Sequence, residues 1–375
     1  MYTQIRRGGS SVLWKHRENG YGIYDWQLYM PKSWFGDSYK DLMVKCKVPD
    51  NLTFKTKNEI LLSMILSAYE SGNLKAKYVG VDASYGSDST FLDALPESLI
   101  YFADVRGNQL VFASRPETYM PEYKGKCRKP QKPVTSFKPV KIEEIVANDP
   151  ALFNDVVLGI GAKGPIFSKD KVIRVVEVRD GLPGKDVWLY VRQLEDGSLK
   201  YSLSNAPSSS TLEEIRKPAL MRWSIEQYFN ELKHYLGMDH YETRNWAAFY
   251  QYMLLSNIAH LFVNKLRNRF SSRMNTPGAT PYIEHPVSAD EFLDAAIQLE
   301  NKEPITNEKI KAVPDRPQQI LTIGLILKIV SAAFVKIGRL REEIDYHLRT
   351  AASAFESHSK SRLQQALSKR RVVET

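Results

Sequence analysis

Three charged side chains, Arg222, Glu226 and Lys233, lie close together on one edge of a predicted helix. At about 100° per residue they fall within about 40° of one another. The helix also has an apolar side, formed by residues at helical spacing: Ile225, Phe229, Leu232 and Leu236. A carboxylate can bind a metal ion, and Arg and Lys can bind phosphate oxygens. The same spacing is also typical of a solvated helix edge, where opposite charges give weak local stabilisation.

A second candidate for metal chemistry is Asp82, which follows directly after a predicted buried strand at 78–81. The predicted order of elements up to this point is strand, strand, helix, strand, which is typical of an α/β layer. Such sheets bind ligands at the carboxyl ends of their strands. Phosphodiester cleavage proceeds on two divalent cations about 3.5 to 4 Å apart, held by acidic residues from separate elements. Asp82 and Glu226 meet that requirement, although an Asp after a strand is also common as a turn or cap residue.

Two sequence blocks carry a resemblance to a known family. The pattern R-W-S-I-E-x-x-F-x-x-x-K at 222–233 resembles the last catalytic block of DDE-type insertion-sequence transposases, whose signature is Tyr-(2)-Arg-(3)-Glu-(6)-Lys. Arg222, Glu226 and Lys233 match in type and spacing, whereas Ala219 stands where the family has Tyr. The block D-A-S-Y-G, which begins at Asp82, resembles the family's second acidic block, D-x-x-Y-G.

The resemblance implies an RNase H-like core with a catalytic metal site. In it, Asp82 and Glu226 would hold two divalent ions, Mg²⁺ or Mn²⁺. Arg222 and Lys233 would hold DNA phosphates, and Tyr85 would orient the DNA or the Asp82 loop. A separate run of cations forms either a solvated loop or a contact to the DNA backbone: Lys124, Lys126, Arg128 and Lys129.

The family's first catalytic Asp has no counterpart in the sequence. It belongs to a D-D-T-x-x-x-K segment, which does not occur here. The early segment D-W-Q-L-Y-M-P, which begins at Asp25, resembles a later family segment, D-x-x-L-Y-L-P, two strands downstream of that first Asp. The resemblance covers roughly residues 20–270. We therefore expect a truncated transposase that is inactive as a nuclease alone, and the alternative is a non-catalytic DNA-binding or regulatory transposase remnant.

Composition favours a soluble protein with a polyanionic partner. The 375 residues are 43% hydrophobic and 25% charged, with a formal net charge of +9. The two cysteines, Cys46 and Cys127, are too few for a disulfide framework. The longest apolar run, 320–335, is shorter than a membrane span. The resemblance implies element terminal repeats and target DNA as partners, a homodimer on DNA, and a cytoplasmic, nucleoid-associated location without membrane contact.

The predicted fold class is mixed α/β: an RNase H-like mixed sheet flanked by helices, with an inserted β-rich subdomain and a helical C-terminal part. Changes in composition and periodicity divide the chain into four parts. These are an incomplete first part of the core at 1–105, the β-rich insertion at 106–205, closing core helices with Glu226 at 206–270, and a helical region at 271–375.

One glycine motif offers a third reading. The segment 159–164 satisfies G-x-G-x-x-G, which in a nicotinamide-dependent enzyme opens a helix whose N-terminus binds the pyrophosphate. Here Pro165 follows, and the residues at 172–178 have the pattern of another strand. The motif therefore predicts a turn in a β region.

Several other segments carry predictions. We expect a β-hairpin at 10–30, a buried helix at 246–270, polar linkers at 271–286 and 302–316, and a flexible basic tail at 360–371. Thr211 is a predicted helix N-cap, and Pro218 is expected to separate two helices. Asp88 is a predicted cap, and Asp93 and Asp104, which have no counterpart in the resemblance, are interpreted as surface charges.

Overall fold

A computed structural model describes most of the chain, at residues 2–3, 10–17, 20–72, 76–122, 131–149, 151–161, 164–194, 196–221, 223–242, 244–271, 279–283, 287–301, 303, 310–314, 323–335 and 340–373. It forms two compact units, and we describe each by itself. The first unit comprises Met1–Leu13, Thr56–Asn154 and Ser168–Ala219, and the second comprises Trp14–Lys55, Asp155–Phe167 and Leu220–Thr375. The division into four parts made from the sequence stays a prediction.

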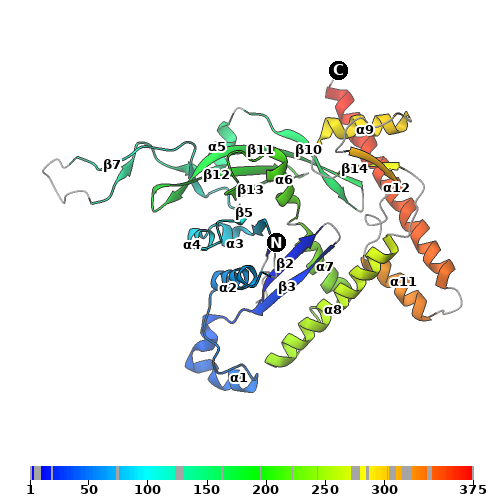
Figure 1. The fold of residues 1–375 in the computed structure, drawn as a ribbon, viewed down its shortest axis with the longest axis horizontal. Helices are drawn as coiled ribbons and strands as arrows, with labels where there is room; N and C mark the ends of the chain where they lie inside the picture. The colour runs from blue at the N-terminus through cyan, green and yellow to red at the C-terminus, as the bar shows by residue number, and fades with distance from the viewer. Residues whose placement is uncertain are drawn as a thin grey trace. The chain divides into compact units, whose positions relative to one another are not determined.

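A mixed sheet forms the centre of the first unit (Figure 1). Its strands lie in the order β11 (Gly164–Arg179), β12 (Leu182–Gln193), β13 (Leu199–Ser204), β5 (Ile100–Val105), β4 (Tyr78–Val81) and β1 (Tyr2–Thr3). The pairs β1·β4 and β4·β5 are parallel, whereas β5·β13, β13·β12 and β12·β11 are antiparallel. The mixed α/β class predicted from the sequence is confirmed, and the architecture is consistent with an RNase H-like fold.

Local sequence explains the first elements of this unit. Strand β4 reads Tyr-Val-Gly-Val, and its last three residues are buried. Helix α2 (Lys57–Glu70) begins with a capping box, in which Thr56 and Glu59 each bond to the other's backbone N–H. The residues that bury one side of α2 recur at helical spacing: Ile60, Leu61, Met64, Ile65 and Ala68.

The strands of the β-rich insertion continue the central sheet, because β13 pairs with β5. One face of these strands packs against helix α5 (Ile142–Asn148) around a core of aliphatic residues: Val105, Val111, Ile142, Val146, Val175, Val187, Leu189, Val191 and Leu203. Strand β6 (Leu110–Phe112) pairs with β11 and with β9 (Val140–Lys141). A separate two-stranded ribbon joins β7 (Thr118–Tyr119) to β8 (Val134–Thr135).

Helix α6 (Leu212–Met221) adds Ile215 to a buried cluster with Phe102 and Tyr190. Thr211 caps this helix as predicted, since its Oγ1 accepts from Glu214 N at 3.3 Å. The prediction that Pro218 ends the helix is wrong. The helix runs through Pro218 to Met221, because one lost hydrogen bond is a smaller loss than the packing of the whole helix.

The second unit begins with the predicted β-hairpin. Strands β2 (Ser10–Arg17) and β3 (Gly20–Leu28) are neighbours in the sheet, and the residues of β2 from Trp14 onward belong to this unit. Short helices follow the hairpin: η1 (Lys32–Phe35), η2 (Asp37–Tyr39) and α1 (Lys40–Lys45). They pack around the buried residues Met30, Cys46 and Val48.

Helices make up much of the second unit: α7 (Trp223–Leu236), α8 (Trp246–Ser271), α11 (Ile323–Val335) and α12 (Leu340–Val373) (Figure 1). Val263 of α8 packs against Ile323 and Ile326 of α11. The prediction of a buried helix holds for one side of α8, which includes Met253, His260 and Val263. The other side is exposed at Leu254, Leu255, Ile258, Leu261 and Phe262. The predicted flexible tail is also wrong, since α12 is one continuous helix through 360–371.

The remaining elements of this unit include strands that local pattern did not predict. Strand β14 (Ala279–Ile283) pairs with β16 (Ile310–Pro314), in segments interpreted as polar linkers. Strand β10 (Asn154–Gly161), whose residues from Asp155 belong here, pairs with β15 (Val287–Ser288), and helix α9 (Ala289–Glu300) follows. Across the described residues, each helix is too short or too polar to cross a membrane.

Candidate functional site

Asp82 lies at the carboxyl end of β4 and caps the first turn of α3 (Ala83–Gly86). Its Oδ1 atom accepts from the backbone N of Ser84 at 2.9 Å and from Ser84 Oγ at 2.6 Å. Within the described part of the chain, Oδ2 makes no hydrogen bond or ion pair. The carboxylate is therefore fixed through one oxygen and has the other available to a ligand.

The turn after Asp82 is held against the sheet by a close backbone approach. A Cβ atom at Gly86 would lie 2.1 Å from the carbonyl oxygen of Asp104, so only glycine fits there. Tyr85 is fully buried and packs against Phe91 of α4 (Ser89–Asp93), with ring centroids 5.4 Å apart. Of the two predicted roles of Tyr85, burial favours the orientation of the Asp82 loop over that of DNA, because its ring belongs to the core beneath the Asp82 turn.

Asp104 occupies the position on β5 that corresponds to Asp82 on β4. The last paired residues of the two parallel strands are Val81 and Ala103, and an Asp follows each of them. Asp104 Oδ1 accepts from Ser202 Oγ of β13 at 2.7 Å. The interpretation of Asp104 as a surface charge is wrong, because its carboxylate is bonded within the sheet. The position of Asp104 beside Asp82 depends on how β4 and β5 pair, and this pairing cannot be read from a single sequence.

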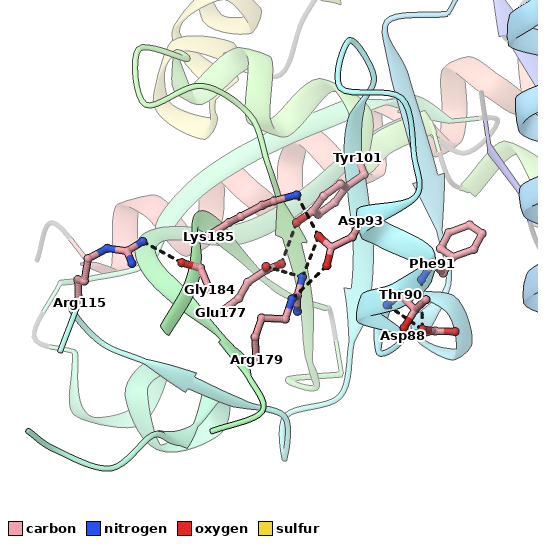
Figure 2. Close-up of polar contacts among 10 residues, drawn as sticks. All are labelled: Asp88, Thr90, Phe91, Asp93, Tyr101, Arg115, Glu177, Arg179, Gly184 and Lys185. Carbon is pink, nitrogen blue, oxygen red and sulfur yellow. Dashed lines mark hydrogen bonds and ion pairs between the residues drawn. The ribbon is translucent and has the colours of Figure 1, made fainter. Parts of the chain in front are cut away.

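The predicted cap at Asp88 is confirmed, and it orders the next part of the Asp82 segment. Asp88 Oδ1 accepts from the backbone N of Thr90 at 3.0 Å and of Phe91 at 3.2 Å, as Figure 2 shows. Its other oxygen accepts from Asn58 Nδ2 of α2. Two consecutive Asp caps therefore define the course of the chain from β4 to the end of α4.

In the second unit, α7 carries Glu226 and Lys233 on its partly exposed edge. Ile225 and Phe229 are buried, so the helix has the amphipathic pattern that the sequence predicted. Arg222 lies outside the described residues, and so do the four cations at 124–129. Their predicted contacts with DNA phosphates stay predictions.

A buried polar network joins α7 to α8. Glu231 Oε2 lies 2.9 Å from Nε2 of His260, and Asn264 Nδ2 lies 2.9 Å from Nδ1 of the same ring. Gln227 Nε2 donates to the other oxygen of Glu231 at 2.9 Å, and Tyr228 Oη donates to Oδ1 of Asn257 in α8. Glu231 is about 140° from Glu226 around the helix at 100° per residue, so the two residues lie on different sides of α7.

Asp25, the first Asp of the sequence, lies within β3. Burial raises the pKa of its carboxyl group, and the hydrogen bond that it accepts from the backbone N of Trp26 at 2.8 Å acts in the opposite direction. Tyr250 Oη of α8 accepts a hydrogen bond from the backbone N of Leu28, in the same strand, at 3.2 Å. Asp25 therefore has a structural place in the hairpin.

The donor chemistry of Asp82 suits a hard divalent cation. Mg²⁺ binds through one or two carboxylates and keeps several waters, and a strand-end carboxylate with one available oxygen meets that need. Asp82 belongs to the first unit and Glu226 to the second. Among the described residues, no three His, Cys, Asp or Glu side chains form a group that could hold a metal ion. The convergence of Asp82 and Glu226 on one metal pair therefore stays a prediction.

The glycine motif at 159–164 belongs to two strands. Strand β10 ends at Gly161 and β11 begins at Gly164, so a strand follows the glycines where dinucleotide binding requires a helix. The alternative of a nicotinamide-dependent enzyme is thereby removed.

Comparison with known families gives a match over the first part of the chain. Residues 11–154 match the family model of the DDE superfamily endonucleases. This segment contains the β2–β3 hairpin, the strands β4 and β5, and Asp82 itself, whereas Glu226 lies outside it. No curated protein matches the chain. The first part of the chain is thus similar to DDE endonucleases, which act on DNA with divalent metal ions.

Proposed function

We propose that the chain is a DNA transposase of an insertion sequence, which binds element-end DNA and catalyses metal-dependent DNA cleavage and strand transfer. The observation that carries this proposal is Asp82. It stands at the carboxyl end of a parallel strand, with one oxygen available, inside the segment that is similar to DDE endonucleases.

In this proposal Asp82 and Glu226 hold two divalent ions, Mg²⁺ or Mn²⁺. When bound, these ions supply activation of the attacking oxygen and stabilisation of the leaving one. The chain's own residues orient and hold the substrate. Arg222 and Lys233 lie on the same edge of the predicted helix as Glu226, and in this proposal both bind phosphate oxygens. Arg222 does so through its planar guanidinium group and Lys233 through its ammonium charge.

Cleavage by this chain is proposed to be impaired. Strand β1 (Tyr2–Thr3) pairs beside β4 but brings no carboxylate, and the first Asp of the sequence is Asp25 in β3. Two carboxylates hold a metal pair less firmly than three. A non-catalytic DNA-binding or regulatory remnant is the second candidate function.

DNA is the proposed partner, as element terminal repeats and target DNA, with the protein acting as a homodimer on DNA. The net charge of +9 supports a polyanionic partner. The sequence between β7 and β8 contributes Lys124, Lys126, Arg128 and Lys129, which we assign to the DNA backbone.

A salt titration of DNA affinity tests this partner. The logarithm of the binding constant should fall with the logarithm of salt concentration by about 0.9 for each neutralised phosphate. Changing the four cations at 124–129 to Gln should lower the slope by up to about 3.6 in total. The matched control changes four exposed lysines to Gln: Lys32, Lys40, Lys45 and Lys55. Equal losses in both variants would contradict the assignment of the cation run.

A cleavage assay on plasmid DNA with Mn²⁺ tests the enzymatic part. The wild-type chain is expected to cleave weakly or not at all. Robust cleavage that survives both Asp82→Asn and Glu226→Gln would overturn the assigned site. Robust cleavage that either change abolishes would instead support the site and remove the claim of impairment.

A further inference from the structure

Five polar side chains form a connected cluster in the first unit (Figure 2). Tyr101 Oη of β5 donates to Glu177 Oε1 of β11 at 2.8 Å, and Arg179 Nη2 lies 2.7 Å from Glu177 Oε2. Asp93, at the end of α4, lies 3.4 Å from Arg179 Nε and 2.9 Å from Lys185 Nζ of β12. The cluster therefore joins a core strand and the Asp82 segment to the hairpin β11–β12.

The charges of this cluster depend on one another. Only 3% of the Glu177 side chain is exposed, and its burial raises the pKa of that carboxyl group, while the charge of Arg179 opposes the rise. Burial also raises the pKa of Asp93, but the hydrogen bond from Lys185 and the charge of Arg179 outweigh it, so the net shift is downward. Asp93 is thus held in its charged form: it lies at the surface, as the sequence predicted, and it is paired there with Arg179 and Lys185.

The hairpin turn fixes Arg179 and Lys185 on one side of the strands. Asp180 and Gly181 both have positive φ, 51° and 81°, as a two-residue hairpin turn of this hand requires. A Cβ atom at Gly184 would lie 2.8 Å from Cγ of Arg179, so the Arg side chain lies directly over that glycine. The turn therefore presents both cations in a defined geometry.

Asp93 also terminates the segment that Asp82 begins. Asp82 caps α3, Tyr85 of α3 packs on Phe91 of α4, and α4 ends at Asp93. The segment is anchored at Gly86 against β5, at Asp88 through Asn58 of α2, and at Asp93 against the hairpin. Loss of the Asp93 anchor leaves α4, and through the Tyr85–Phe91 contact also α3, less firmly held.

We infer that Asp93, Arg179 and Lys185 are positioning residues for Asp82: the hairpin of the β-rich insertion holds the Asp82–Asp93 segment in its metal-binding geometry. This inference rests on the proposed function, in which Asp82 is a metal ligand. Removal of a group that bonds directly to a metal ligand changes metal affinity by about 10- to 100-fold. Asp93 acts on Asp82 through α4 and α3, so its effect is expected at the lower end of this range.

Mn²⁺ binding to the 375-residue protein, measured by electron paramagnetic resonance of the free ion, tests the inference. Asp93→Asn keeps the shape of the side chain and leaves Arg179 paired with Glu177, and it should weaken Mn²⁺ binding about 10-fold. Asp93→Glu should restore most of the affinity. The matched control is Asp186→Asn, which removes the partner of Arg115 on the same hairpin without touching α4. It should leave Mn²⁺ affinity unchanged.

Asp82→Asn separates the inference from the proposed function. If Asp82→Asn weakens Mn²⁺ binding and Asp93→Asn does not, the positioning role is refuted and the site stands. If Asp82→Asn has no effect, the proposed site fails, and the inference fails with it. Amide hydrogen exchange provides a second readout: residues 83–93 should exchange faster in Asp93→Asn and at the wild-type rate in Asp186→Asn. Equal exchange in both variants would also refute the role.

Discussion

The network between α7 and α8 gives the sharpest stability prediction. His260 is fully buried, and its ring contacts Glu231 at 2.9 Å, Asn264 at 2.9 Å and the Tyr228 ring at a centroid distance of 4.6 Å. The change His260→Leu keeps a similar apolar volume and removes the imidazole partner of Glu231, of which only 5% is exposed. The buried carboxyl group of Glu231 then loses its hydrogen-bond partner on α8.

The size of the effect follows from the state of the pair. Breaking a buried ion pair by removing one partner costs about 3–5 kcal/mol. If the imidazole is neutral, the loss is that of a buried hydrogen bond, about 1–3 kcal/mol. Glu231→Gln keeps a hydrogen-bonding oxygen and removes the charge, so it should cost less than His260→Leu. Adding Glu231→Gln to His260→Leu should recover part of the loss, because no buried charge then stays uncompensated.

Urea unfolding followed by circular dichroism measures these differences, and amide hydrogen exchange locates them in α7 and α8. Exchange should rise in α7 and α8 and stay unchanged in the sheet of the first unit. A destabilisation below about 0.5 kcal/mol for His260→Leu would refute the reasoning, since a surface substitution gives as much. A double variant whose loss equals the sum of the two single losses would refute the coupling between Glu231 and His260.

Two further predictions concern ion pairs in the first unit. Arg216→Met should destabilise the protein by about 3–5 kcal/mol in urea unfolding, because Asp170 is fully buried and accepts two hydrogen bonds from Arg216, at 2.5 and 2.8 Å. Adding Asp170→Asn to this variant should recover part of the lost stability. A loss below about 1 kcal/mol for Arg216→Met would contradict the prediction. The hydrogen bond from Lys171 lowers the pKa of the Asp149 carboxyl group in the folded protein. The pair should therefore stabilise the folded state at pH values above 3.8, the ordinary pKa of Asp. This stabilisation should be lost as the pH falls through the lower pKa of the folded state. In thermal unfolding between pH 2 and pH 6, Asp149→Asn should flatten the acid dependence, and an unchanged dependence would rule the contribution out.

Sequence pattern predicted the elements whose boundaries are set by nearby residues. The strand at 78–81 is a short apolar run, and its observed bounds agree with the prediction. The caps at Asp88 and Thr211 follow from side chains that bond within three residues. Local chemistry of this kind acts over one turn, so one sequence is sufficient to show it.

The misplaced elements depend on contacts between distant residues or on summed propensity. Strands β14 and β16 pair across an intervening helix, and neither has a pattern that indicates its partner. Helix α12 continues beyond 354 because strong helix formers such as Ala, Leu, Gln, Lys and Arg outnumber the serines of its polar second half. A basic composition alone therefore did not distinguish a tail from a helix.

The candidate site was predicted in part for the same reason. Asp82 follows an apolar strand, and the sequence shows this directly. The carboxylate Asp104 becomes its neighbour only through the parallel register of β4 and β5, and Asp93 meets its cations only through the hairpin β11–β12. Both were interpreted as surface charges because their partners lie about 90 to 100 residues away in sequence.

The β-rich insertion rejoins the core next to the strand from which it leaves, and this restricts its effect on the core around Asp82. Strand β13 ends beside β5, and Asn205 then accepts from Tyr101 N at 2.7 Å and donates to Leu99 O at 3.2 Å. The chain leaves the core after Val105 and re-enters it on the adjacent strand, so the length of the insertion does not change where α6 begins. The insertion can therefore influence Asp82 through the pairing of β13 with β5, where Ser202 bonds to Asp104, and through side chains that reach back to α4. Among the described contacts, the ion pairs of Asp93 with Arg179 and Lys185 do so.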